Sequence, residues 1–372
     1  MSRTRPSPFR RPFRAAVLAL AVGLLAACGE EPPVVIGAIL PLSGPGVSVG
    51  ADIRDGLALG VEEVNERGGI NGRRLVLAVE DGAGDEEASR AAWEAIVSGA
   101  SGGDDPLVVL AGTSALSLSL KPLAEEQNRL LVGLVAAAPA LTEDARSVYR
   151  YWPTAEQELP VLTSVLPRDA QTLVVYYLDD PYGNAVFDRT KARLAETDMR
   201  IAGVAFPLAV TDFTTLVSAA SQGDAVLVVG FAPHIRGVLG ALEAQGYDGP
   251  IAATTTATLP EVVGDPAADG VHVVAPAIFN RNFVFADEVR VRYEARHGKS
   301  FNHYVANGYD IIVMLAGLLD GRVADEPTLR AQLENGFRYS GLFGNVSLAS
   351  GARDMDFPLF PARIRKGELV YR

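Results

Sequence analysis

The sequence predicts an α/β protein of two doubly wound lobes, because short apolar runs alternate with amphipathic segments of helical length. This alternation occurs in two successive blocks, about 34–142 and 172–274. Parallel strands need crossover connections, and the intervening segments have the length of crossover helices. The chain has 372 residues, 48% of them hydrophobic, which is enough for two separate cores.

The first block holds four apolar runs that are typical of buried parallel strands. These runs are Val34–Leu40, Leu75–Val79, Leu107–Leu110 and Leu130–Val135. An apolar stripe of helical period from Ile53 to Val64 predicts a helix after the first strand, and Gly68–Gly69 is expected to end it. The acidic run Asp85–Glu87 is typical of the start of another helix.

The second block repeats this rhythm and is followed by a helical segment and a β-rich tail. Strands are expected at Thr172–Leu178, Ile201–Phe206, Ala225–Gly230, Ile251–Thr254 and Val271–Val274. Helices are expected at Asn184–Glu196, Phe213–Ala220, Ile235–Ala244, Phe283–Arg296, Tyr304–Leu319 and Pro327–Asn335. The tail runs through Val346, Phe357–Ile364 and Leu369–Tyr371.

The segment from Leu107 to Thr142 contains the most informative position for a ligand. Ser114 follows directly on an apolar strand, and small ligands of open α/β sheets lie at the carboxyl ends of the strands. The period-two pattern of 116–120 and the presence of Pro122 favour a strand or a break. A helix is nevertheless expected, because the two flanking parallel strands need a crossover. Its unpaired N–H groups would suit a carboxylate or a similar oxyanion.

The first 27 residues have the anatomy of a signal peptide. Five arginines precede an apolar run at 15–27, which is too short for a mature membrane span. Leu25-Ala26-Ala27-Cys28 resembles the bacterial lipobox, which implies that Cys28 is acylated after cleavage, with 28–33 as a tether. The alternative is an ordinary secretory peptide with an incidental cysteine. Gly29, directly after the cysteine, favours the outer membrane as the destination of such a lipoprotein.

Charge and composition argue against several classes of function. Removing the five leader arginines from the total charge of −12 leaves about −17, so nucleic acid is not expected as a partner. A single cysteine excludes an internal disulfide. The four histidines form no metal-binding pair with a glutamate spacing, so neither a metal nor a cofactor is expected. Gly46–Gly50 fits the G-x-S-x-G pattern of hydrolases, but the strand does not run directly into it.

An ordered series of short motifs resembles the leucine/isoleucine/valine-binding family of type I periplasmic binding proteins, which serve ABC importers. The motifs are Pro41–Pro45, Asn65–Gly72, Glu80-Asp81 with Asp85, Ser114, Pro122–Glu126, Pro139–Thr142, Tyr149-Arg150, Pro153-Thr154, Asp180–Gly183, Thr211–Phe213, Asp224–Val226, Gly308–Asp310, and Gly341 with Gly344. The resemblance implies two lobes that close on a ligand about a three-strand hinge, no catalysis, and a monomer that contacts permease subunits. We expect crossings near Trp152, at 275–280 and at 339–344. These divide the chain into 1–27 (signal peptide), 28–33 (tether), 34–152 with 281–339 (lobe 1), and 153–280 with 340–372 (lobe 2).

The resemblance also implies a set of ligand-binding positions. They are Ser114, Ala115, Val135, Ala137, Tyr182, Phe231, Thr255 and Val49. Ser114 aligns with the serine that holds a ligand carboxylate, while Thr255 (or its neighbours Thr254 and Thr256) stands where amino-acid binders have an acid. A buried ammonium without a carboxylate is costly. We therefore expect a compact ligand with an acidic or strongly hydrogen-bonding head and an apolar body: an amino acid, or a related organic acid or amide.

Two other functions remain open at this point. One is a regulatory lipoprotein that uses the same fold to bind a partner protein. The other is an esterase that uses Ser48 as its nucleophile. An empty cleft that no small molecule stabilises would favour the regulator, and hydrolysis of a generic ester would favour the esterase.

Overall fold

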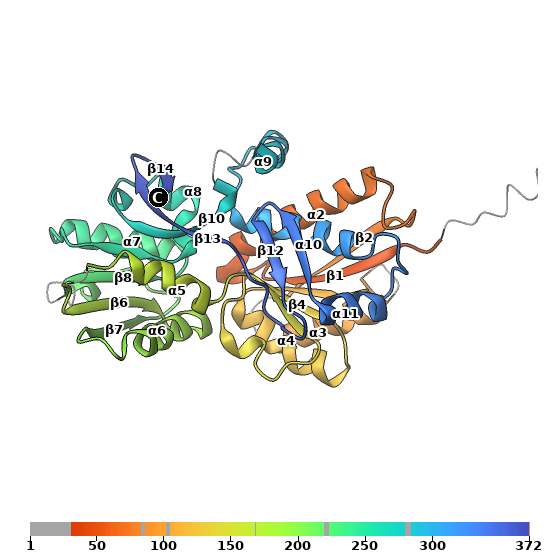
Figure 1. Ribbon diagram of the computed structural model, residues 1–372, viewed down its shortest axis with the longest axis horizontal. Coiled ribbons are helices and arrows are strands. Elements are labelled where there is room, and N and C mark those ends of the chain that lie inside the picture. Colours follow the sequence, from red (N-terminus) through yellow and green to blue (C-terminus); the bar gives the residue numbers. More distant parts are fainter. Residues whose placement is uncertain are drawn as a thin grey trace, which may run out of the picture.

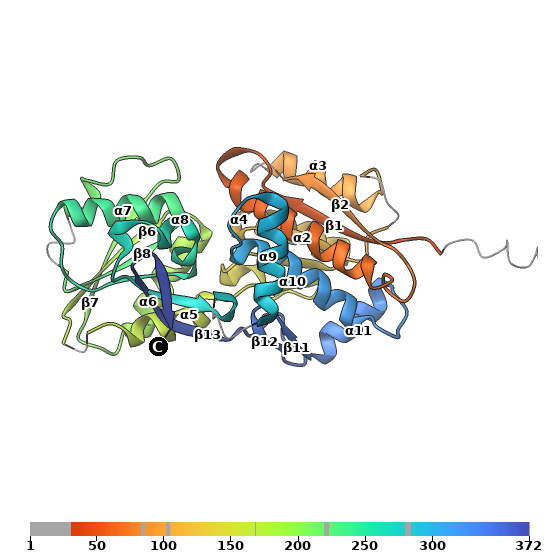
Figure 2. The same cartoon turned by 90° about the horizontal axis from the view of Figure 1, so that it is seen from above.

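The computed structural model describes residues 31–82, 86–101, 105–167, 169–218, 223–279 and 284–371. The leader, the lipobox with Cys28, and Asp85 lie outside these residues. In the described part of the chain, no helix is both long enough and apolar enough to cross a bilayer. Two sheets, one parallel and one mostly parallel, lie in separate lobes, so the predicted fold class is confirmed (Figures 1 and 2).

The first lobe is built on a five-stranded sheet of order β2-β1-β3-β4-β5, with every pairing parallel. Its strands are β1 (Val34–Leu40), β2 (Leu75–Asp81), β3 (Val109–Gly112), β4 (Leu131–Leu134) and β5 (Val148–Tyr151). Its helices are α2 (Val47–Glu66), α3 (Glu86–Val97) and α4 (Ser114–Glu126). The order reverses between β1 and β3, so a crevice forms there at the carboxyl ends of the strands.

Elements from much later in the chain complete the first lobe. They are α9 (Val284–His297), α10 (His303–Leu318), α11 (Glu326–Asn335) and the hairpin of β11 (Phe337–Gly341) and β12 (Gly344–Leu348) (Figure 1). Helix α10 lies against α2 at a distance that only glycine permits. A Cβ on Gly308 would lie 2.3 Å from the carbonyl oxygen of Ile53. This close packing holds the start of α10 beside the crevice.

The second lobe repeats the topology of the first. Its sheet has the order β14-β13-β10-β9-β8-β6-β7, in which β6 to β10 are parallel and the last two strands antiparallel. The strands are β6 (Thr172–Leu178), β7 (Arg200–Phe206), β8 (Ala225–Val229), β9 (Ile251–Ala253), β10 (His272–Pro276), β13 (Leu359–Arg365) and β14 (Glu368–Tyr371). The helices are α5 (Ala155–Ser164), α6 (Pro181–Leu194), α7 (Ala232–Ala244) and α8 (Pro260–Val263). The order reverses between β6 and β8, which gives this lobe its own crevice.

The third crossing between the lobes differs from the prediction. Residues 339–344, expected to pass into the second lobe, belong instead to the β11–β12 hairpin. This hairpin is held to the first lobe by Asp310 of α10, which accepts hydrogen bonds from the Tyr339 hydroxyl and the Leu342 N–H. The chain therefore changes lobes between Leu348 and Leu359, and the predicted boundary at residue 340 is wrong.

One expected helix is also wrong. The described part of 213–220 forms a turn and a short 3-10 segment, because the Asp212 carboxylate accepts the Thr214 N–H in a local turn. Phe213 instead buries its ring edge-on against Phe206. By contrast, the ambiguous segment after Ser114 is helical over its full predicted length, as the crossover requires.

Candidate ligand-binding site

A cavity of about 380 Å³ lies where the two crevices face each other. The first lobe contributes Pro41, Ser43, Gly46, Thr113, Ser114, Ala115, Leu116, Val135 and Tyr304, and the second contributes Asp180, Tyr182, Leu208, Phe231 and Thr256. Most of these residues directly follow the carboxyl end of a strand. The topology of both sheets therefore brings them to one place.

Ser114 is the first residue of α4 and forms the polar end of the cavity. Its Oγ accepts the N–H of Ala138 at 3.2 Å, so the hydroxyl proton remains available as a donor. The first turn of the helix adds unpaired N–H groups and the positive end of the helix dipole. A hydroxyl, free N–H groups and a helix dipole in one cavity wall suit a carboxylate.

The backbone on either side of the Ser114 end of the cavity is held in an unfavourable conformation. Thr113 has φ 66° and ψ 158°, and Val135 has φ 51°. Both residues are β-branched, and positive φ costs such residues about 1–3 kcal/mol each. Both line the cavity. The surrounding structure must therefore hold these two turns in place.

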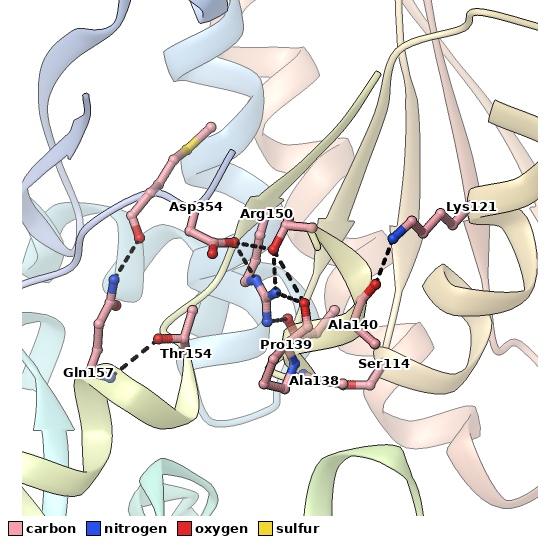
Figure 3. Close-up of polar contacts among 12 residues, drawn as sticks. Ser114, Lys121, Ala138, Pro139, Ala140, Arg150, Thr154, Gln157 and Asp354 are labelled. Carbon is pink, nitrogen blue, oxygen red and sulfur yellow. Dashed lines mark hydrogen bonds and ion pairs between the residues drawn. The ribbon is translucent and has the colours of Figure 1, made fainter. Parts of the chain in front are cut away.

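Arg150 helps to hold the loop that follows Val135 in place (Figure 3). The side chain is fully buried and donates to the carbonyl of Ala136 at 3.0 Å and to the Thr142 hydroxyl at 2.8 Å. Its Nε also contacts the Asp354 carboxylate at 2.8 Å. Because Asp354 lies in the third crossing, one guanidinium joins the Ala136–Thr142 loop to the connection between the lobes.

The second lobe presents Asp180 and Tyr182 at the end of β6. The Asp180 carboxylate accepts the Gly183 N–H at 2.7 Å and so begins α6. A Cβ on Gly183 would lie 1.9 Å from the carbonyl oxygen of Leu178, so this tight start admits only glycine. Burial raises the pKa of Asp180.

Behind this wall lies Glu158, a buried acid on α5 that is 1% exposed. It accepts the Thr255 N–H at 3.2 Å, the Thr255 hydroxyl, and the Tyr182 hydroxyl at 3.4 Å. Burial raises the pKa of Glu158 to about 7. Burial and the Glu158 charge together raise the pKa of Tyr182, so its hydroxyl stays a donor.

The family described as "Periplasmic binding protein" matches residues 33–368 of this sequence. The chain belongs to that family. The predicted assignment to its leucine/isoleucine/valine-binding branch, within type I, is also confirmed. The Leu/Ile/Val-binding protein BraC3 of Rhizobium johnstonii is 29% identical over 164 residues, which cover 43% of this chain and 44% of BraC3.

Other comparisons extend over more of this periplasmic binding protein. The chemotactic signal transduction system substrate-binding protein BasB of Halobacterium salinarum is 28% identical and covers 80% of this chain and 72% of its own. LivJ of Streptococcus pneumoniae, solved with isoleucine, has a TM-score of 0.78 at 17% identity, covering 91% of this chain and all of LivJ. A solute-binding protein of Rhodopseudomonas palustris, solved with 3,4-dihydroxybenzoic acid, has a TM-score of 0.80 at 18% identity, with 92% and 97% covered. These structures are similar in fold.

Five of the eight predicted site residues line the cavity of this periplasmic binding protein: Ser114, Ala115, Val135, Tyr182 and Phe231. Their contact with a ligand stays a prediction. The other three do not line it. Val49 and Ala137 are buried in the core of the first lobe, and Thr255 is turned toward Glu158, while its neighbour Thr256 faces the cavity.

Two acids and a tyrosine were missed by the sequence reasoning. Asp180 carries a signal, since it directly follows a strand, but it reads equally well as a helix cap. Tyr304 and Glu158 come from helices that no motif links to the ligand, so no local pattern reveals them. Ser48 lies exposed in the first turn of α2 and does not line the cavity, so the strand-to-helix elbow that the esterase interpretation needs is not formed there.

Proposed function

We propose that this protein is the extracytoplasmic solute receptor of an ABC importer and captures a small amino acid, or a related organic acid or amide, between its two lobes. The observation that carries the proposal is the position of the cavity. It lies where the strand order reverses in both sheets, and Ser114 and the start of α4 line one side of it. A carboxylate there would accept hydrogen bonds from the Ser114 hydroxyl and the first turn of α4. The apolar residues Leu116, Val135, Leu208 and Phe231 would surround its body.

The ligands of two structural neighbours support this class. Isoleucine and 3,4-dihydroxybenzoic acid, found in the neighbours from Streptococcus pneumoniae and Rhodopseudomonas palustris, are compact molecules that combine a carboxylate with an apolar or aromatic body. The cavity described above has matching parts: one donor-rich end and a largely apolar wall. Its 380 Å³ suits a molecule of that size.

We further propose that Cys28 carries the lipid anchor and that the receptor acts outside the cytoplasm at a bacterial membrane, where it meets its permease. The leader and the lipobox-like Leu25–Cys28 support this. Mass spectrometry of the purified chain should find cleavage before Cys28 and a diacylglyceryl adduct on its thiol. A Cys28→Ala variant should instead be released in soluble form.

The proposed ligand class is tested by thermal-shift screening of residues 29–372 against amino acids, organic acids and amides. A ligand at about a hundred times its Kd should stabilise the protein by about 2.7 kcal/mol. Ser114→Ala should weaken binding by about tenfold or more, because it removes a donor to a charged oxygen. Ser119→Ala, on the same helix and outside the cavity lining, is the matched control. Unchanged affinity in Ser114→Ala would remove Ser114 from the site.

A second candidate function is sensing rather than uptake. BasB, a relative that is aligned over most of both chains, is named as part of a chemotactic system. Both functions use the same cavity and differ in the membrane partner. Deleting the protein from its host should abolish uptake of the ligand if it serves an importer, and should abolish only the response to that ligand if it serves a receptor.

A further inference from the structure

We propose that His303 is an acid-sensitive latch between the two lobes: its uncharged ring holds the lobes together, and protonation of the ring favours their separation. This inference goes beyond the proposed function, because it concerns the arrangement of the lobes in the ligand-free protein. Where the lobes capture a solute, the same latch weakens the capture in acid, and that consequence rests on the proposed function.

The first step is the position of His303 at the contact between the lobes. It is the first residue of α10 in the first lobe, and its Nδ1 lies 2.9 Å from the Thr258 hydroxyl oxygen of the second lobe. Its fully buried ring packs against Trp152 of the first crossing and Phe279 of the second, with ring centroids 5.5 and 6.3 Å away. One side chain therefore contacts both lobes and two of the segments that join them.

The second step is the place of the proton on the ring. The Thr258 hydroxyl donates its single proton to the Thr255 carbonyl at 2.8 Å, so it accepts a hydrogen bond from His303. In the neutral ring the proton is therefore on Nδ1, and Nε2 carries none. The buried Nε2 has no hydrogen-bond partner among the described residues. A second proton would go to Nε2 and create a buried cation whose new N–H has no acceptor there.

The third step is the charge around the ring. Because Nδ1 is bonded to Thr258 and Nε2 is not bonded, no carboxylate of the described residues pairs with the ring. Burial lowers the pKa of His303 to about 3, so the ring is uncharged while the lobes are in contact. The titratable side chains on the described elements around it are Tyr304 and Asp310 on α10, Asp52 on α2, Tyr151 on β5, Glu158 on α5, Tyr182 on α6, Glu261 on α8, Glu294 on α9 and Glu368 on β14.

The fourth step is the effect of separating the lobes. Separation removes Thr258 and admits water to the ring, so the pKa of His303 returns toward the ordinary value of about 6.5. The separated form then binds a proton more tightly than the closed form does. The closed form is therefore fully favoured above about pH 6.5 and loses this advantage as pH falls from 6.5 toward 3. At pH 5.5 the ratio of separated to closed molecules should be about tenfold higher than at pH 8.

The test measures the radius of gyration of the ligand-free protein by small-angle X-ray scattering at pH 8 and pH 5.5, with circular dichroism at both. The unacylated Cys28→Ala chain serves as the reference protein, and every other change is made in it. Its radius should be larger at pH 5.5 while its secondary structure stays the same. His303→Asn keeps a side-chain N–H but does not titrate, so its radius should be the same at both pH values. Thr258→Val removes the acceptor for Nδ1, so its radius should already be larger than the reference at pH 8.

Two other titratable residues serve as matched controls. His297→Asn, at a partly exposed histidine of α9 in the same lobe, should keep the response of the reference protein to pH. Glu158→Gln should keep it as well, because the contacts of Glu158 all lie within the second lobe.

Three results overturn the inference. They are an unchanged radius of the reference protein between pH 8 and pH 5.5, an expansion that is accompanied by loss of secondary structure, and an equal expansion of His303→Asn. If His303→Asn does not fold, Thr258→Val decides, and a radius equal to that of the reference at pH 8 overturns the inference. The proposed capture of a solute is tested separately by the ligand screen, so either conclusion can fail while the other stands.

Discussion

At the scale of single residues, Glu158 is where burial and charge oppose each other most directly. The carboxyl group is 1% exposed, and its three hydrogen-bond donors are neutral. Burial raises its pKa from 4.5 to about 7. The folded state therefore binds a proton more tightly than the unfolded chain does, so folding is favoured at low pH and loses this advantage as pH rises.

This shift predicts a specific pH dependence of stability. Relative to Glu158→Gln, the wild-type protein should lose about 3 kcal/mol of unfolding free energy between about pH 4 and about pH 8, because each pKa unit corresponds to about 1.4 kcal/mol. Most of the loss should fall between pH 4.5 and about 7, the unfolded and folded pKa values. Urea titrations of both proteins across this range measure it. If the stability of the two proteins changed with pH in parallel, the raised pKa of Glu158 would be contradicted. The control variant Glu156→Gln should follow the wild type.

Single residues also show why part of the site was predictable. Ser114 and Phe231 were placed at the cavity because each follows an apolar run that marks a strand end, and Tyr182 because it stands in the Asp180–Gly183 motif. Thr255 was misplaced by one position relative to Thr256, since neighbouring residues of a 3-10 helix point in different directions. Tyr304 lies far from the other lining residues along the chain, and only tertiary packing brings it there.

At the scale of elements, the buried strands were predictable and the segments near the crossings were not. Strands β1 and β6 have the predicted bounds, because an uninterrupted apolar run has few alternatives to a central parallel strand. Strand β5 was missed because it is short and carries Arg150, whose burial depends on partners elsewhere. Helix α5 was missed because it contains Pro160 and buries the charged Glu158, which breaks the expected pattern.

The packing of α10 on α2 gives a prediction at this scale. Gly308→Ala should lower the unfolding free energy by about 1–3 kcal/mol, because the added Cβ would lie 2.3 Å from the Ile53 carbonyl oxygen and push the helices apart. Gly317→Ala, on the same helix with no atom within 4 Å of its added Cβ, should instead be stabilising by about 1 kcal/mol. Denaturant unfolding of both variants measures the difference. Equal effects would show that α10 does not depend on this close approach.

At the scale of the whole molecule, the division into lobes follows from two sheets that share no strand. Three segments join them, and hydrogen bonds also pass between the lobes beside the cavity, such as that of 2.9 Å between Thr258 Oγ1 and His303 Nδ1. Thr258 belongs to the 3-10 segment Thr255–Thr258. Thr255 of this segment contacts Glu158, and Thr256 lines the cavity. The segment Thr255–Thr258 therefore contacts both the cavity and the opposite lobe, so it can respond to the ligand and to the arrangement of the lobes.

This arrangement predicts that ligand binding compacts the protein. A ligand held by Ser114 on one lobe and by Tyr182 and Phe231 on the other can contact both sets of residues only when the lobes approach, so its binding energy shifts the population toward the closed form. Small-angle X-ray scattering at about a hundred times the Kd should show a smaller radius of gyration than the free protein. Ser114→Ala at the same ligand concentration should stay near the free value. Thermal stabilisation of the wild type with an unchanged radius would show that the ligand binds without closure, and the hinge between the three crossings would then have no part in capture.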